Sequence, residues 1–240
     1  MNLISVKPFI LGQISNPLSL SECDAIKNDM LFWYESKCQL FVSGNGKLKI
    51  DTKLDKNLFD KFIDQSSEIT RLALGRLTSK YFLKKLAIRF SLLVILGRLD
   101  LRSLDILKAI FGLGTAKIRV ELSWLPIGSF IVPHTDSYAK LFSGLIYLPQ
   151  DNDEHLGTIF WNSKIKNEEN LHYHGDLMTE FNKSKNELFK PSFENKSLYF
   201  FIRNQYSWHG MEEISHQRKD YVRLSINVNI ISERDLPKKK

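Results

Sequence analysis

His134 and Asp136 lie two residues apart, with Thr135 between them, in a short polar segment between two apolar runs. The run before them, residues 121–132, and the run after them, residues 141–149, are rich in β-branched and aromatic residues and are predicted to be strands. Side chains two residues apart along a strand point to the same side, so this imidazole and this carboxylate can face one point. They are two of the three ligands of a two-histidine, one-carboxylate Fe(II) site, so the pair predicts a second histidine from elsewhere in the chain.

His209 is the best candidate for that second histidine. It follows the apolar segment 197–203 and precedes a glycine, which places it at the end of a predicted strand. The 75 residues that separate it from His134 leave room for several strands. An antiparallel barrel would bring both histidines to one mouth.

A competing His-x-Asp pair consists of His174 and Asp176, with His172 two residues earlier. This pair lies in the polar, weakly patterned segment 163–196, which has no flanking predicted strand to hold it. Metal ligands need a rigid frame, so we assign the metal site to His134 instead. We expect the competing pair to face the substrate or to lie in a surface loop.

The last predicted strand, residues 221–230, alternates polar and apolar side chains with a period of two. One face carries Arg223, Ser225, Asn227 and Asn229, and the other carries Leu224, Ile226, Val228 and Ile230. We expect the apolar face to pack on the helices of the N-terminal half and the polar face to line a wet or charged space. A guanidinium beside a hydroxyl suits a bound carboxylate. The alternative is an exposed strand whose arginine pairs with an acidic side chain.

Taken together, His-x-Asp, a distant His and Arg-x-Ser resemble the Fe(II)- and 2-oxoglutarate-dependent oxygenases, in their bacterial, prolyl-hydroxylase-like branch. The flanking segments resemble that family as well: the turn Pro126-Ile-Gly128, the strand at 140–149, Leu156-Gly-Thr158, and 206–211 around the distal histidine. The resemblance covers residues 115–232, whereas residues 1–114 carry none of its motifs.

The resemblance implies a double-stranded β-helix, a jelly-roll or cupin-like barrel. Together with the helical pattern of the N-terminal half, it predicts an α+β fold in which those helices pack on the barrel. Residues 116–232 would form the oxygenase core, interrupted by a polar insert at 163–196. Residues 1–115 would form a mainly helical support region, and residues 233–240 a basic tail.

The resemblance also implies iron on His134, Asp136 and His209. The distal carboxylate of 2-oxoglutarate would lie on Arg223 and Ser225, with Tyr147 as a third contact. The implied reaction consumes O2, with ascorbate as an optional reductant, hydroxylates an unactivated C–H bond of a small molecule or glycan, and releases succinate and CO2. Because Asp136 retains the carboxylate ligand that halogenating relatives lack, hydroxylation is favoured over halogenation.

Two positions depart from the family patterns. The Gly-Gly-x-Thr segment of many relatives is His-Leu-Gly-Thr at 155–158. Asn229 stands where nucleic-acid repair enzymes of the AlkB type carry a second arginine, which argues against a demethylase of nucleic acids.

Three other functions stay open. A protein side-chain hydroxylase of the prolyl type would take a peptide in a groove lined by 163–196. A cupin-like metal-binding protein without turnover is disfavoured because a structural metal needs no anion clamp. The hypothesis of a nucleic-acid binder depends only on the basic stretch 71–102. This stretch has eight basic residues and one acidic residue, in a chain of net charge +7. That stretch would suit an anionic partner or membrane surface, or it is a solvated helix face.

The remaining composition is that of an ordinary globular chain: 240 residues, of which 43% are hydrophobic and 25% charged. Cys23 and Cys38 have no metal-type spacing, and neither a signal peptide nor an apolar run long enough to span a membrane is present, so a cytoplasmic location is expected.

In the N-terminal half, Ser19-Leu-Ser-Glu22 predicts a capping box before a helix that ends near Tyr34. Apolar residues then recur at three and four over 54–96, which predicts two helices divided at Gly75 or at Thr78-Ser79, and a further helix is expected over 101–111. Strands are expected at 117–125, 128–132, 141–148, 157–161, 197–203, 206–209 and 221–231.

Overall fold

The computed structural model describes residues 2–37, 56–79, 116–151, 154–167, 175–195 and 197–232. Several expectations concern residues outside these ranges: the greater part of the basic stretch 71–102, the helix at 101–111, Cys38, His172, His174 and the tail 233–240.

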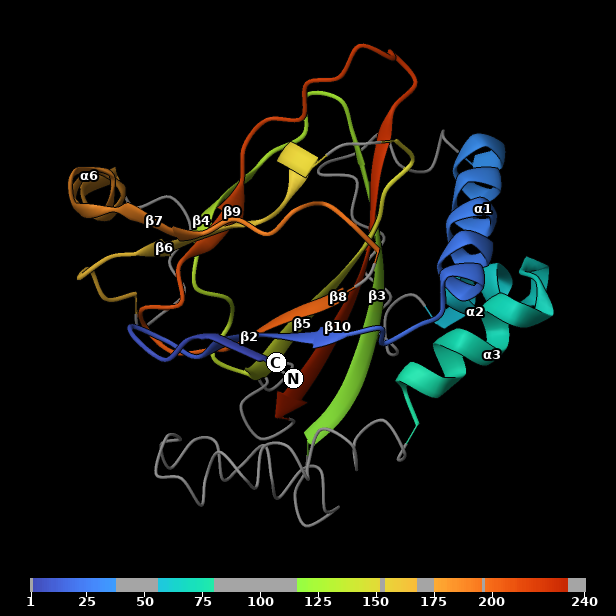
Figure 1. Cartoon of the computed structure of the whole chain (residues 1–240), viewed down its shortest axis with the longest axis horizontal. Helices are drawn as coiled ribbons and strands as arrows, with labels where there is room; N and C mark the ends of the chain where they lie inside the picture. Colours follow the sequence, from blue (N-terminus) through green and yellow to red (C-terminus); the bar gives the residue numbers. More distant parts are fainter. Residues whose placement is uncertain are drawn as a thin grey trace.

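Two antiparallel sheets form the centre of the molecule (Figure 1). The larger sheet has the order β1-β2-β8-β5-β10-β3 and consists of β1 (Asn2–Ser5), β2 (Leu11–Ser15), β8 (Ser197–Ile202), β5 (Lys140–Leu148), β10 (Val222–Ser232) and β3 (Ala116–Pro126). The smaller sheet has the order β4-β9-β6-β7 and consists of β4 (Ile131–His134), β9 (His209–Met211), β6 (Ile159–Asn162) and β7 (Asn186–Phe189).

Most strands of the C-terminal half lie close to the segments that the sequence predicts, but β9 shares only His209 with the predicted 206–209, and β7 is not predicted. The Pro-x-Gly turn joins β3 to β4, and Gly128 takes a φ of 80°, which glycine adopts without strain. The segment 163–196 is partly regular, because it contains a helix, α6 (Gly175–Ser184), and the strand β7.

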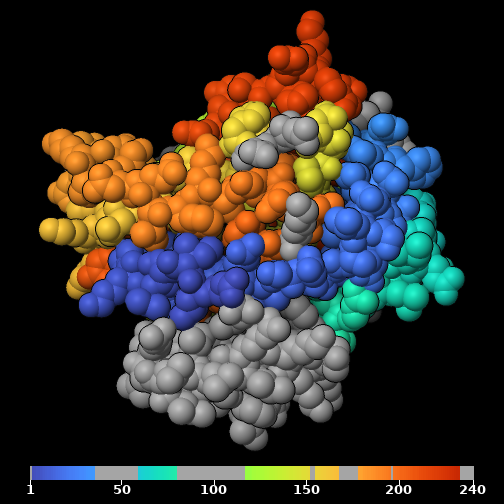
Figure 2. All heavy atoms as spheres, in the orientation of Figure 1, coloured from blue at the N-terminus to red at the C-terminus, as the bar shows by residue number. Residues whose placement is uncertain are grey.

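The N-terminal residues contribute two strands that the sequence does not predict. β2 pairs with β8 from Leu11↔Phe201 to Ser15↔Ser197, and β1 pairs with β2 at the sheet edge. In Figure 2 this strand pair, in dark blue, lies at the near surface of the molecule. Strands of four and five residues are too short for a clear period of two, so their pairing with β8 determines their conformation.

In the described residues before β3 there are three helices: α1 (Leu20–Lys37), α2 (Lys56–Gln65) and α3 (Glu68–Leu77). The capping box of α1 is confirmed, because the Ser19 amide donates to Glu22 Oε2 at 2.7 Å and the Glu22 amide donates to Ser19 Oγ at 3.3 Å. The chain divides at Ser66-Ser67 and not at Gly75, which lies inside α3; Thr78 caps the end of that helix.

None of the helices in the described ranges is both long and apolar enough to cross a membrane.

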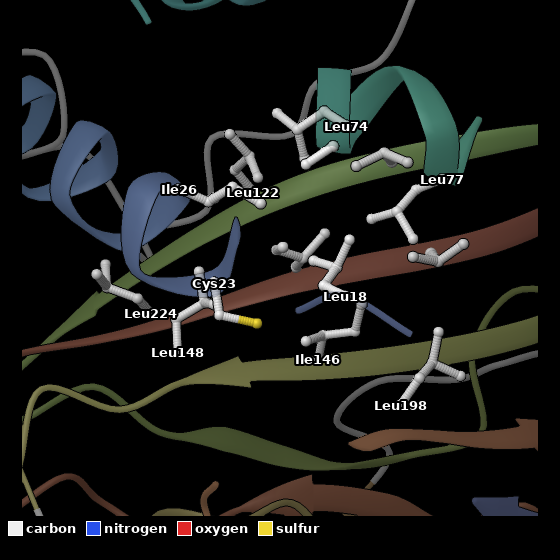
Figure 3. Packing of buried hydrophobic residues seen from close by; sticks show 14 of the residues in the cluster. Leu18, Cys23, Ile26, Leu74, Leu77, Leu122, Ile146, Leu148, Leu198 and Leu224 are labelled. Atoms are coloured by element: carbon white, nitrogen blue, oxygen red, sulfur yellow. The ribbon is translucent and has the colours of Figure 1, made fainter. Parts of the chain in front are cut away.

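The main core lies between the three helices and one face of the larger sheet (Figure 1). Figure 3 shows Ile26 and Cys23 from α1 and Leu74 and Leu77 from α3 in one cluster with side chains of β3, β5, β8 and β10. The apolar face of the last strand belongs to this core through Leu224, Ile226, Val228 and Ile230, as its alternation predicts. The opposite face of the same strand is therefore directed away from the helices, towards the space between the two sheets.

Candidate metal centre

His134, Asp136 and His209 come together at the smaller sheet. Within the described ranges they form a group in which one ligand atom from each residue lies within 4.8 Å of the others. His134 ends β4 and His209 begins β9, and these two residues are direct partners in the antiparallel pair, with ring centroids 4.2 Å apart. All three side chains are buried. Strand pairing therefore joins two ligands that are far apart in the sequence.

The backbone orients both imidazole rings in the same way. Nδ1 of His134 lies 2.9 Å from the Val132 carbonyl oxygen, and Nδ1 of His209 lies 2.9 Å from the Ser207 carbonyl oxygen. A carbonyl only accepts, so each Nδ1 carries the proton and donates it, and the lone pair is left on Nε2. The two Nε2 atoms lie 3.6 and 3.7 Å from the carboxylate oxygens of Asp136. Both rings thus direct their metal-binding nitrogen to one point.

The protonation state of His209, like its orientation, is suited to metal binding. Burial, assisted by the neighbouring His134, lowers the pKa of His209 to about 3. The ring is therefore neutral near pH 7, and the neutral imidazole is the form that binds a metal ion.

The backbone at Asp136 is not the extended strand that the alternation of side chains predicts. β4 ends at His134, and Asp136 lies in the following turn with a φ of 65°, in the left-handed region where aspartate is among the tolerated residues. Thr135 still faces away, since its hydroxyl donates to the Asn167 carbonyl oxygen at 3.3 Å. The prediction that the His134 and Asp136 side chains face one point is confirmed, but a turn after β4, and not a continuous strand, gives them this orientation.

Two side chains from β5 hold the Asp136 carboxylate. Lys140 Nζ lies 2.7 Å from Oδ1, and the Ser143 hydroxyl donates to Oδ2 at 2.8 Å. Burial alone would raise the pKa of Asp136, but Lys140 and the two histidines hold that pKa well below its ordinary value. The carboxylate is therefore ionised and fixed in orientation, as a metal ligand must be.

One cavity connects this triad to the polar face of β10. Its lining includes the three triad residues together with Arg223, Ser225, Asn227 and Asn229. The prediction that this face lines a polar space is thereby confirmed. The strand contributes its apolar face to the core and its polar face to the cavity.

Arg223 is almost fully buried and incompletely paired. Its Nε donates to the Leu156 carbonyl oxygen at 2.8 Å, and its guanidinium lies over the rings of Tyr147 and Phe193 at 5.1 and 4.8 Å. Its Nη2 is buried and has no hydrogen-bond partner in the described part of the chain. A buried unpaired donor is costly, so this nitrogen suits a carboxylate bound in the cavity.

Tyr147 does not line the cavity, although Arg223 and Ser225 do. Its hydroxyl oxygen accepts the amide of Thr158 at 3.0 Å, and its ring lies under the guanidinium of Arg223. In this geometry Tyr147 supports the arginine. A direct contact between Tyr147 and 2-oxoglutarate stays a prediction.

The donor set fits the groups that the sequence resemblance implies. Two imidazoles and one carboxylate form a two-histidine, one-carboxylate set, which is typical of non-heme Fe(II) centres that keep open coordination positions. The unpaired nitrogen of Arg223 and the neighbouring hydroxyl of Ser225, both on the cavity wall, fit a dicarboxylate such as 2-oxoglutarate.

Sequence reasoning missed the residues that orient the Asp136 carboxylate. Lys140 and Ser143 begin the strand after His-x-Asp, where polar residues interrupt an otherwise apolar run. These polar positions in an apolar run are the sequence signal that could have indicated a role at the site. Glu121 also lines the cavity. It is a charged residue in the apolar run that precedes His-x-Asp.

Gly210 allows the two histidine strands to approach each other. A Cβ at this position would lie 2.6 Å from the Ile131 carbonyl oxygen and 3.1 Å from the Trp161 ring. We expect Gly210→Ala to destabilise the protein by about 1–3 kcal/mol, the usual cost of overpacking, and to weaken metal binding because β9 must move away from β4. Denaturant unfolding and metal titration measure the two effects.

Gly75→Ala is the matched control for this substitution. Gly75 lies in the interior of α3, and a Cβ there meets nothing within 4 Å. It is expected to raise stability by about 0.8–1 kcal/mol through helix propensity, with metal affinity unchanged. Equal metal affinity in both variants would contradict the role given to Gly210.

Comparisons with known proteins agree with this geometry at the level of fold. No family model and no curated protein matches the sequence. Among solved structures, the chain is similar to the non-heme alpha ketoglutarate dependent carbocyclase SnoK from nogalamycin biosynthesis, with a TM-score of 0.50 and 11% identity over 92% of this chain and 79% of that chain.

Two further similarities are weaker. A Pseudomonas putida prolyl-4-hydroxylase aligns with a TM-score of 0.46 and 11% identity over 95% of both chains. AviO1 from Streptomyces viridochromogenes Tue57 aligns with a TM-score of 0.49 and 10% identity over 95% of this chain and 91% of that chain. The similarity to SnoK shows a shared fold, and the described residues place a His–Asp–His triad within it. The resemblance to the Fe(II)- and 2-oxoglutarate-dependent oxygenases is therefore supported by the fold and by the presence of the three triad residues.

Proposed function

We propose that this protein is an Fe(II)- and 2-oxoglutarate-dependent dioxygenase that hydroxylates an unactivated C–H bond of a small molecule or glycan, with release of succinate and CO2. The observation that carries the proposal is a single cavity that joins the His–Asp–His triad to a buried guanidinium with an unpaired nitrogen. A protein that held a metal only for structure would have no use for a buried guanidinium with an unpaired nitrogen in the same cavity. Under this proposal the two sheets correspond to a double-stranded β-helix.

The three triad residues would bind the metal on one side. His134 and His209 would each contribute Nε2, and Asp136 a carboxylate oxygen, so that the other coordination positions face the cavity. Bound Fe(II) with 2-oxoglutarate would supply the activation of dioxygen, in which the oxo acid is decarboxylated while the substrate is oxidised. Lys140 and Ser143 would keep the carboxylate of Asp136 in position throughout.

Arg223 and Ser225 would bind the distal carboxylate of 2-oxoglutarate. Both residues are buried, so little water competes for the guanidinium and the hydroxyl. A charge-assisted hydrogen bond in such surroundings is stronger than in water. The Tyr147 and Phe193 rings lie 4.8 Å apart, and the contact of Arg223 with both would hold the guanidinium in one orientation before the cosubstrate arrives.

An anaerobic titration tests the proposed function directly. Fe(II) and 2-oxoglutarate are added together to the metal-free protein, and the visible charge-transfer band of the chelate is followed. We expect the band with the complete mixture and no band when Zn(II) replaces Fe(II), because the band needs a redox-active metal chelated by the oxo acid. Absence of the band with the complete mixture would overturn the proposal.

A turnover assay then addresses the substrate class. After admission of oxygen, succinate release is measured in the presence of metabolite, glycan and peptide pools. Stimulation by a metabolite or glycan pool supports the proposal, and stimulation only by peptides would instead indicate a protein side-chain hydroxylase.

A further inference from the structure

The cavity has a second polar region farther along β10 from Arg223. It is formed by Glu121 of β3 and by Asn227 and Asn229 of β10, which all line the cavity. Glu121 lies directly opposite Asn227 in the antiparallel pair. We call these three residues the acceptor cluster.

The acceptor cluster is separate from the proposed cosubstrate clamp but adjacent to the triad. Asn229 follows Arg223 by six positions on the same strand, which corresponds to about 20 Å along its axis. On the other side of β10, Asn229 pairs with Ser143, whose hydroxyl donates to Asp136. A molecule on the acceptor cluster would therefore lie next to the metal ligands without displacing a carboxylate from Arg223.

The cluster holds more hydrogen-bond acceptors than its protein contacts satisfy. The Glu121 carboxylate is buried and makes two long contacts, with Arg119 Nη1 at 3.5 Å and with Asn229 Nδ2 at 3.3 Å. A carboxylate offers about four lone-pair sites. The amide oxygen of Asn227 is also buried, and it has no hydrogen-bond partner within the described residues. Buried acceptors left unpaired cost free energy, so the cluster suits a ligand that brings donors.

The charges around the cluster favour a neutral donor over a cationic one. Two carboxylates, Glu121 and Asp136, face two protein cations, Arg119 and Lys140, at 3.5 and 2.7 Å. An ammonium group on the ligand would meet both cations as well as the carboxylates. A hydroxyl group avoids that repulsion, because it donates to Glu121 or Asn227 and accepts from the amide nitrogen of Asn229.

We infer that Glu121, Asn227 and Asn229 bind the hydroxyl groups of a neutral, polyhydroxylated substrate and hold it beside the His–Asp–His triad. The inference rests on the proposed function, since it takes the triad as the place of reaction. It narrows the substrate from small molecules in general to compounds with neighbouring hydroxyls, such as sugars and cyclitols.

Ligand-observed NMR tests this inference on the full chain loaded with Zn(II) and 2-oxoglutarate without oxygen. One probe pool contains neutral polyols: glucose, mannose, galactose, their methyl glycosides and myo-inositol. The other contains amines: ethanolamine, putrescine and lysine. We expect saturation transfer to at least one polyol, and a loss of at least tenfold in affinity for that polyol in Glu121→Gln and in Asn227→Leu. The control Glu35→Gln, an exposed carboxylate on α1, should bind the polyol as the unaltered protein does.

Binding of 2-oxoglutarate is measured in the same samples and separates the two proposals. Normal 2-oxoglutarate affinity in Glu121→Gln and Asn227→Leu shows that these variants are folded and that their loss concerns the polyol alone. If the unaltered protein binds 2-oxoglutarate but binds no polyol, or binds only amines, the inference is wrong and the proposed function stands. Polyol affinity that is unchanged in both variants also overturns the inference. If the unaltered protein binds no 2-oxoglutarate, both proposals fail together.

Discussion

Replacement of His209 with alanine is expected to abolish 2-oxoglutarate turnover and to lower the affinity for Fe(II) by more than about 100-fold. Loss of an outer partner of a metal ligand typically costs about 10- to 100-fold in affinity, and here a ligand itself is removed. The substitution takes away an Nε2 that lies 3.7 Å from Asp136 and leaves two ligands of the triad. His134→Ala should behave in the same way, because its ring occupies the equivalent position on β4.

Anaerobic metal titration and succinate release measure these two effects. His155→Ala is the matched control, since this histidine is exposed and does not line the cavity. It should retain the metal affinity and the turnover of the unaltered protein. Succinate formation at the unaltered rate by either triad variant would remove that histidine from the metal centre.

Replacement of Arg223 with methionine is expected to weaken 2-oxoglutarate binding by about 10- to 150-fold, which corresponds to about 1.5–3 kcal/mol for a lost charged hydrogen-bond partner. Methionine retains an apolar stem against Tyr147 and Phe193 but has no donor for the distal carboxylate. Metal affinity should change little, since Arg223 contributes no ligand atom to the triad. The effect therefore separates cosubstrate binding from metal binding.

The apparent affinity for 2-oxoglutarate, followed by the charge-transfer band, measures this loss. Arg218→Met is the control, because Arg218 is exposed and pairs with Asp151 and Asp220 at the surface. A 2-oxoglutarate affinity in Arg223→Met equal to that of the control would exclude Arg223 from the cosubstrate site. A joint loss of metal and cosubstrate binding would show that the substitution damages the fold, since Leu156 also loses its buried donor.

The residue types of the candidate site could be predicted from the sequence because their pattern is local. His134 and Asp136 are neighbours in the chain, and the alternation from Arg223 to Asn229 follows from the period of one strand. The structure confirms the consequence of that alternation, since one face lines the cavity and the other packs under the helices.

Other features could not be predicted because they depend on residues that are distant in sequence. The pairing of β2 with β8 brings the N-terminal residues into the larger sheet, although two short strands give almost no periodic signal. The break between α2 and α3 falls at Ser66-Ser67, where the Asp29 carboxylate of α1 accepts hydrogen bonds from Ser67. Pairing with β8 decides the first outcome, whereas the second also depends on a local cap, because Ser67 Oγ accepts the Thr70 amide at 3.3 Å.

The sequence by itself determined which side chains are available for chemistry: two histidines and an aspartate able to bind a metal, and an arginine two positions before a serine. Only the tertiary structure decided that they meet. The pairing of β4 with β9 places His134 opposite His209, and the turn at Asp136, held by Lys140 and Ser143, directs the carboxylate to the same point. The physical reason is that donor atoms are a property of each residue, whereas their convergence needs long-range strand pairing and a cavity closed by both sheets.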